Sequence, residues 1–137
     1  MSGFVVDASA TLPWCFQDEA TPASNALLVR LQSGDAAIVP GHWLTEVGNG
    51  LLVATRRGRL PLADVNLFLM SLGLLLIEIE EISPFRLSDR VLPLAKSENL
   101  TLYDAVYLEL AQRRGLPLAT RDAALARAAT NVGVVLL

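Results

Sequence analysis

Four of the 14 acids in this 137-residue sequence fall where side chains can do chemistry. Asp7 directly follows one short apolar run, and Asp122 lies two residues after another. Ligands of an open parallel sheet bind beyond the carboxyl ends of its strands, so these two carboxylates would project into one crevice. Glu46 and Asp104 lie near the starts of expected helices, among apolar neighbours, and an acid on an apolar helix face points inward. We therefore expect the four carboxylates to converge.

Converging carboxylates repel one another and are costly to bury, so such a cluster is tolerable mainly when a cation neutralises it. Ligation by oxygen alone selects a hard ion, and retained water favours Mg²⁺ or Mn²⁺ over zinc. A hydrated divalent ion can activate water and stabilise the charge that develops on a phosphoryl oxygen. The cluster therefore predicts phosphodiester hydrolysis.

Each acid also has a purely structural interpretation. Asp7 and Asp122 could cap the helices that follow them, which is common for aspartate at a strand-to-helix turn. Glu46 and Asp104 could be first-turn acids that the helix dipole favours. One acid alone favours the structural interpretation, whereas the spacing of the whole set favours a site.

The elements that must position these acids alternate between short β-rich runs and longer helical patterns. Strands are expected at residues 4–6, 37–39, 77–82, 118–120 and 132–136. This alternation predicts an α/β fold with a mainly parallel sheet. No repeat, linker or low-complexity segment interrupts it, so we expect residues 1–137 to form a single domain.

Two helix boundaries have a clear mechanism. Gly58 suits the left-handed position just past a helix end, and Pro61 suits the first turn of the next helix, which together predict a helical hairpin. Thr101 can cap a helix that runs through Arg114 and ends at Gly115.

Four segments of the chain resemble a known family. They are residues 5–9 (VVDAS), 43–49 (WLTEVGN), 101–107 (TLYDAVY) and 118–122 (LATRD). These segments are similar to the signature segments of PIN-domain nucleases, and their order, spacing and total length look most like the VapC toxins of type II toxin-antitoxin modules. The resemblance covers nearly the whole chain. It implies a PIN-like three-layer α/β/α sandwich with a central, mainly parallel sheet and a protruding helical hairpin.

The same resemblance implies a function. The chain would be a metal-dependent endoribonuclease of single-stranded or loop RNA, with the four acids as its catalytic Mg²⁺ or Mn²⁺ site. Ser9 and Thr120 match hydroxyl positions near the metal, and Asn49 matches a polar residue one helical turn beyond Glu46. VapC-like proteins form homodimers and are held inactive by a VapB-like antitoxin segment across or near the active site. Two small departures, Gly48 and Gly50, stand where alanine-like residues are usual and put the rigidity of that helix in doubt.

Other residues have two interpretations each. Arg56, Arg57 and Arg59 could steer an RNA backbone or act as ordinary cations near a helix C-terminus, and Arg121 is better placed to contact substrate or partner. His42 could share a helix face with Glu46, but hard cations prefer oxygen, so we expect a surface or capping histidine.

Two further groups of side chains are assigned no chemistry. Trp14, Trp43, Tyr103 and Tyr107 have apolar neighbours and are predicted to be core residues, with base stacking left open for Tyr103. Acids at 78, 80 and 81 are typical of a solvated strand edge. The hairpin over 51–76 is more apolar than one small core needs, so its surplus is a candidate dimer or antitoxin surface.

Composition excludes several classes of protein. At 53% hydrophobic residues and a net charge of -3, the chain can bury enough surface to avoid disorder. Its most apolar stretch, 67–77, is too short to cross a bilayer. A lone cysteine, Cys15, allows no intramolecular disulfide and favours the cytoplasm. The charge argues against nucleic acid only until the four site acids are set aside, because the remaining ten acids face 11 basic residues.

Two rival functions remain. A receiver-like signalling domain also has an acidic Mg²⁺ pocket at its strand ends, but Asp7 has no acidic neighbour and the only lysine, Lys96, precedes Asp104 in a helical stretch. A PIN-like module that binds RNA or a partner without cleavage would keep the same acids.

Overall fold

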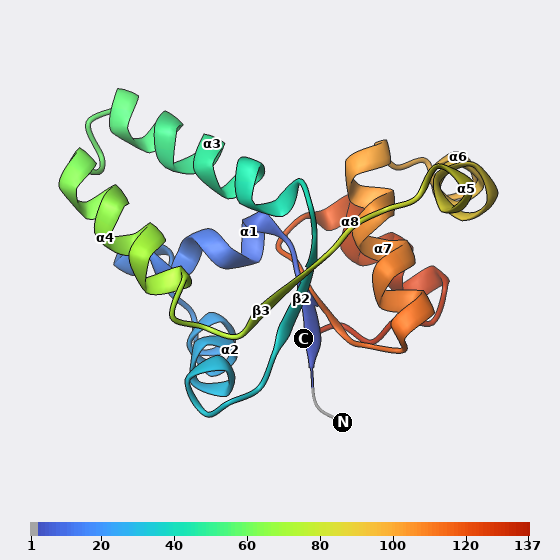
Figure 1. The fold of residues 1–137 in the computed structure, drawn as a ribbon, viewed down its shortest axis with the longest axis horizontal. Coiled ribbons are helices and arrows are strands. Elements are labelled where there is room, and N and C mark those ends of the chain that lie inside the picture. The colour runs from blue at the N-terminus through green and yellow to red at the C-terminus, as the bar shows by residue number, and fades with distance from the viewer. Residues whose placement is uncertain (1–2) are drawn as a thin grey trace.

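The computed structural model describes residues 3–137, which form a parallel sheet between two layers of helices (Figure 1). The strands are β1 (Phe4–Val6), β2 (Ala37–Pro40), β3 (Ile77–Glu80) and β4 (Leu118–Ala119). Their order is β3-β2-β1-β4, and each neighbouring pair is parallel. The expected α/β class with a parallel sheet is confirmed.

The helices cover both faces of this sheet. They are α1 (Ala8–Thr11), η1 (Leu12–Trp14), η2 (Gln17–Glu19), α2 (Pro22–Gln32), α3 (Trp43–Arg56), α4 (Leu62–Leu72), α5 (Pro84–Arg86), η3 (Leu87–Val91), α6 (Leu92–Glu98), α7 (Leu102–Arg114) and α8 (Ala123–Asn131). Figure 1 shows α1 to α4 on one side of the strands and α5 to α8 on the other, so the three-layer prediction is confirmed. Among residues 3–137, no helix has both the length and the apolar character that a membrane span requires.

The core is centred on β1 and β2, whose residues are fully covered. Val5 pairs with Ile38 on one side and with Leu118 on the other. Leu51 from α3 and Leu108 from α7 belong to the same buried cluster. Strands buried on both faces read as continuous apolar runs, which is why these segments carry no alternating polar residues.

The predicted helix boundaries are confirmed to within one residue. Gly58 has a φ of +71° and lies between α3 and α4, which form the arm at the upper left of Figure 1. Pro61 is extended and precedes α4 rather than opening it. Thr101 accepts a hydrogen bond from the backbone N–H of Asp104, and Gly115 ends α7 with a φ of +65°.

The run 132–136 is not a strand, so that prediction is wrong. Helix α8 continues to Asn131, and Gly133 then turns the chain with a φ of +80°. Because β4 has two residues, the returning chain makes one parallel bridge, between Leu118 and Leu136. The β-branched composition indicated a strand, but the adjacent strand is too short to build a ladder.

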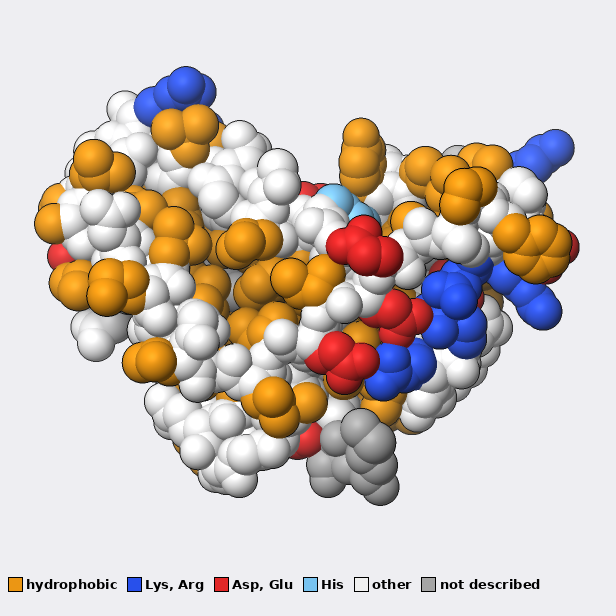
Figure 2. Space-filling model, in the orientation of Figure 1, with side chains coloured by type: hydrophobic (Ala, Val, Ile, Leu, Met, Phe, Trp, Pro, Cys, Tyr) orange, Lys and Arg blue, Asp and Glu red, His pale blue; other side chains and the backbone are white. Residues whose placement is uncertain are grey.

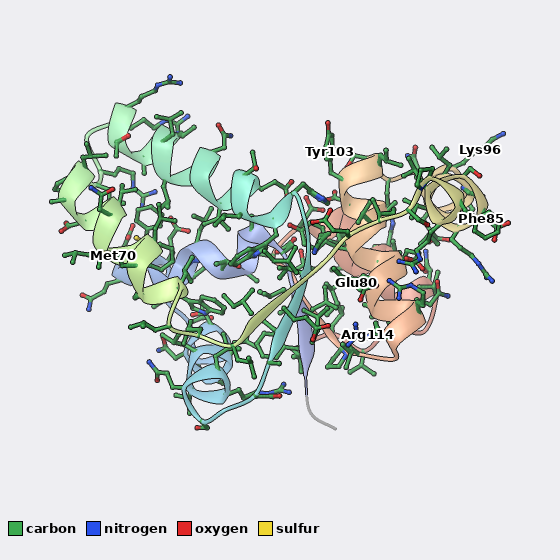
Figure 3. All side chains as sticks on the ribbon, in the orientation of Figure 1. Met70, Glu80, Phe85, Lys96, Tyr103 and Arg114 are labelled. Carbon is green, nitrogen blue, oxygen red and sulfur yellow. The ribbon has the colours of Figure 1, made fainter. Side chains whose placement is uncertain are left out.

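Ion pairs connect the edge strand β3 to the helices beside it. Glu80 pairs with Arg86, Arg113 and Arg114, which ties β3 to α7, and the labels in Figure 3 show Glu80 and Arg114 at this junction. Burial disfavours the ionised form of Glu80, but the hydrogen bonds from Arg113 and Arg114 outweigh it and lower its pKa. The acids of the edge are therefore not uniformly solvated, because Glu80 is partly buried in an ion-pair network.

The two unusual glycines of α3 occupy different environments. A Cβ at Gly50 would lie 2.6 Å from a methyl carbon of Leu12, whereas a Cβ at Gly48 would meet no heavy atom of the described chain within 4 Å. Close packing of α3 against η1 therefore explains Gly50, and nothing in this packing requires Gly48.

We predict that Gly48→Ala raises the free energy of unfolding by about 0.5–1 kcal/mol, because alanine loses less backbone entropy in a helix. In Gly50→Ala the Leu12 side chain must shift, so this variant should be less stable than Gly48→Ala. Urea unfolding of both variants measures the difference. Equal stabilisation by both substitutions would contradict the packing explanation.

Candidate active site

Asp7 lies where β1 ends and is almost covered, with an exposed fraction of 5%. Its Oδ1 accepts hydrogen bonds from Ser9 Oγ at 2.6 Å and from the Ala10 backbone N–H at 3.0 Å. Its Oδ2 accepts one from Thr120 Oγ1 at 2.5 Å. Both hydroxyl groups that the resemblance assigned to the site therefore hold this carboxylate in place.

The segment after β4 is joined to the segment after β1 by the same hydroxyls. The backbone N–H of Arg121 donates to Ser9 Oγ at 2.8 Å, and that of Asp122 donates to Thr120 Oγ1 at 3.0 Å. Asp122 also caps α8 by accepting from the Leu125 N–H at 2.9 Å. Helix capping is thus correct for Asp7 and Asp122, and it coexists with their convergence, because a cap position fixes a carboxylate at the strand end.

Glu46 lies in the first turn of α3 and contacts α7 through Tyr107. Tyr107 has an exposed fraction of 1%, and its hydroxyl donates to Glu46 Oε1 at 2.6 Å. Burial and this hydrogen bond raise the pKa of Tyr107, so its hydroxyl stays protonated and remains a donor. One oxygen of Glu46 is therefore fixed by a buried side chain.

Asp104 completes the group from the first turn of α7. Burial, together with the charges of Asp122, Asp7 and Glu46, raises its pKa from the ordinary 3.8 to about 6. Burial also raises the pKa of Asp7, against its hydrogen bonds from Ser9, Thr120 and Ala10. Asp104 thus lies within reach of the charges of the other three predicted acids, at the carboxyl edge of the sheet.

This edge opens into a notch that Figure 2 shows between the α3 side and the α6–α7 side of the surface. Within residues 3–137, no three of the His, Cys, Asp and Glu side chains form a group that could hold a metal as they stand. The charged groups that act on Asp104 are nevertheless all carboxylates, and their repulsion, added to burial, disfavours its ionised state. That donor chemistry fits a hard divalent cation, which would relieve the repulsion.

The other candidate residues are not gathered with the acids. Asn49 is exposed, and no hydrogen bond joins its side chain to the four acids in the described chain. Arg56 and Arg57 lie at the end of α3, about 15 Å along the helix from Glu46.

Two candidate arginines bind the segment before α2. Arg59 pairs with Asp18 and Glu19 and lies over the Phe16 ring, 4.4 Å from its centroid. Arg121 donates from Nη1 to the backbone carbonyl of Glu19 at 3.2 Å.

Sequence reasoning missed the aromatic surroundings of Glu46. Tyr107 was predicted only as core, although its position three residues after Asp104 places both on one helix face. His42 occupies the N-cap position of α3 and is partly exposed, but its side chain makes no cap hydrogen bond, and its buried Nε2 has no hydrogen-bond partner within residues 3–137. The core prediction holds for Trp43 and is wrong for Tyr103, which is exposed.

Comparison with family models matches residues 4–131 to the PIN domain. The chain therefore belongs to the PIN domain family, and its parallel four-stranded sheet flanked by helices is the PIN fold. A search of curated proteins found no match.

Solved structures share this fold. PAE2754 from Pyrobaculum aerophilum aligns with a TM-score of 0.71 and 26% identity, over 93% of this chain and 79% of that chain. VapBC2 from Rickettsia felis, bound to a promoter DNA fragment, aligns with a TM-score of 0.63 and 13% identity, over 98% and 97%. A toxin-antitoxin complex from Klebsiella pneumoniae aligns with a TM-score of 0.55 and 19% identity, over 87% and 86%.

The raised pKa of Asp104 predicts how stability depends on pH without metal. The folded state binds this proton more tightly than the unfolded state, so the free energy of unfolding should fall as pH rises from about 4 to about 6 and then level off. Asp104→Asn removes the penalty, so the variant should be more stable than the parent at pH 7, by a margin that shrinks towards pH 4.

Urea unfolding in EDTA at four pH values between 4 and 7 measures this margin. Asp64→Asn, an exposed acid in the first turn of α4, is the matched control and should show no such trend. A margin for Asp104→Asn that does not change with pH would contradict the predicted repulsion.

Proposed function

We propose that this PIN domain is a Mg²⁺- or Mn²⁺-dependent endoribonuclease and the toxin of a type II toxin-antitoxin pair. The observation that carries the proposal is the electrostatic coupling of Asp7, Glu46, Asp104 and Asp122 at the carboxyl edge of the sheet. Carboxylates in that state favour a hard divalent cation and are hard to reconcile with a purely structural role.

In this proposal each residue has a definite task. Asp7, Glu46, Asp104 and Asp122 hold the ion, Ser9 and Thr120 orient the carboxylate of Asp7, and Tyr107 orients that of Glu46. When bound, the ion supplies an activated water and stabilises charge on a phosphoryl oxygen. Asn49, Arg121, Arg56, Arg57 and Arg59 remain weaker candidates for substrate contact, since Arg59 and Arg121 already contact the segment before α2.

An antitoxin partner is supported by two structures that share this fold, the toxin-antitoxin complex from Klebsiella pneumoniae and VapBC2 from Rickettsia felis. A homodimer is supported by the surface of α4 and the turn after it, where Leu67, Met70 and Leu74 have exposed fractions of 64%, 70% and 89%. Figure 2 shows hydrophobic side chains gathered over the α3–α4 side. Contiguous apolar surface of this kind is typical of protein interfaces.

The receiver-like alternative is disfavoured by the family, because residues 4–131 match the PIN domain. A non-catalytic PIN-like module remains the second candidate, since the same acids could serve binding alone. Cleavage and growth assays discriminate between the two.

We predict that purified protein cleaves single-stranded RNA in Mg²⁺ and that Asp7→Asn and Asp104→Asn each lower the rate at least a hundredfold, because each removes a metal ligand. Asp64→Asn should cleave at the parental rate. Gel assays with and without EDTA measure this, with circular dichroism as the check on folding. Undiminished cleavage by both variants would refute the mechanism.

The toxin role predicts growth arrest when the chain is expressed alone in a bacterial host. Asp7→Asn should relieve the arrest at equal protein level, whereas Asp64→Asn should not. Colony counts with immunoblots measure this outcome. Arrest that persists with Asp7→Asn would point to a harmful effect independent of cleavage.

A further inference from the structure

Three aromatic rings form a row from the core to the surface beside the acids. Tyr107 is buried, and its ring centroid lies 5.0 Å from that of His42, at an interplanar angle of 71°. The His42 ring lies 5.6 Å from that of Tyr103, at 63°. These are favourable edge-to-face contacts, so each ring supports the next.

The outer member of this row is open to solvent. Tyr103 has an exposed fraction of 62%, and Figure 3 shows it projecting from the start of α7, at the rim of the notch. An exposed ring gains little from burial, so stabilisation of the core does not explain it. It is nevertheless held in a defined place by His42.

Its position relative to the acids is set by His42, which contacts both. The His42 ring lies 5.6 Å from that of Tyr103, and His42 Nε2 lies 3.7 Å from Glu46 Oε1. A nucleic acid with a phosphodiester at these acids would therefore bring a neighbouring base to the Tyr103 ring.

The acidic surroundings of Tyr103 favour a nucleobase over a phosphate as the group that this ring binds. The site itself is acidic, Arg59 and Arg121 already contact the segment before α2, and Arg56 and Arg57 lie at the far end of α3. Stacking on an aromatic face needs no cation and accepts any base that is not already paired.

We propose that Tyr103, supported by His42, is a stacking platform for an unpaired nucleobase next to the scissile phosphodiester. The proposal rests on the proposed ribonuclease function and deepens it, because it makes single-stranded RNA the substrate form that this site selects. Bases in a duplex are already stacked and cannot reach the ring.

The test measures binding of a fluorescently labelled single-stranded RNA decamer in Mg²⁺ by anisotropy, in the Asp7→Asn background to prevent cleavage. Tyr103→Ala should weaken binding about tenfold, the usual effect of losing one stacked base. Tyr103→Phe should recover most of the affinity, because the ring remains. Phe85→Ala, which removes another exposed aromatic on α5, is the matched control and should bind like the parent.

A second arm replaces single bases of the decamer by abasic sites. One position should weaken binding to the parent but not to Tyr103→Ala, because the base and the ring form a single contact. Equal losses in both proteins at every position, or binding by Tyr103→Ala within twofold of the parent, would overturn the platform and leave the ribonuclease function standing.

Two other outcomes would also overturn the stacking platform. A protein with Asp7 intact that neither binds nor cleaves single-stranded RNA in Mg²⁺ overturns the platform and the proposed function together. Unchanged RNA binding by Tyr103→Ala with loss of a protein partner would assign the ring to a protein interface and overturn the stacking role.

Discussion

Mutual repulsion among carboxylates at one edge of a parallel sheet is the constraint on which the rest of this structure depends. The pKa of Asp104 is about 6 because burial and three neighbouring acids all oppose its ionisation. A fold that places acids this way loses stability unless something holds them or a cation neutralises them. Hydrogen bonds from the surrounding structure fix three of the carboxylates. Hydroxyl groups donate to Asp7, a backbone N–H at the start of α8 donates to Asp122, and a buried tyrosine donates to Glu46.

The same contacts that hold the acids also join distant parts of the chain. Ser9 and Thr120 link the segments after β1 and β4, which are more than 100 residues apart in sequence. Tyr107 links α7 to α3 across the carboxyl edge. The hydrogen bonds of the site therefore also connect the elements of the fold, and the geometry of the site is set by rigid elements on both sides of the sheet.

Around this edge, the two helical layers carry different surfaces. The α3–α4 hairpin extends a largely apolar surface, whereas the layer with α7 carries the ion pairs of Glu80 and the exposed ring of Tyr103 (Figure 2). An apolar surface suits a protein partner, and an aromatic ring beside acids suits a base. The division matches the proposed toxin, which needs both an antitoxin or dimer surface and a site for RNA.

The sequence by itself determined the class of the fold and its parallel sheet, and it predicted the four acids as a set, because these follow from local patterns. Apolar runs, a threonine cap at Thr101 and glycine positions such as Gly115 act within a few residues. The strand predicted at residues 132–136 is wrong, because a strand needs a neighbouring strand to pair with and β4 has two residues.

Only the tertiary structure decided the contacts between remote elements. These are the hydrogen bond of Tyr107 to Glu46, the row of rings that ends in exposed Tyr103, and the ion pairs of Arg59 with Asp18 and Glu19. No spacing rule encodes such contacts, because they arise where elements far apart in sequence are brought together by the burial of a common core.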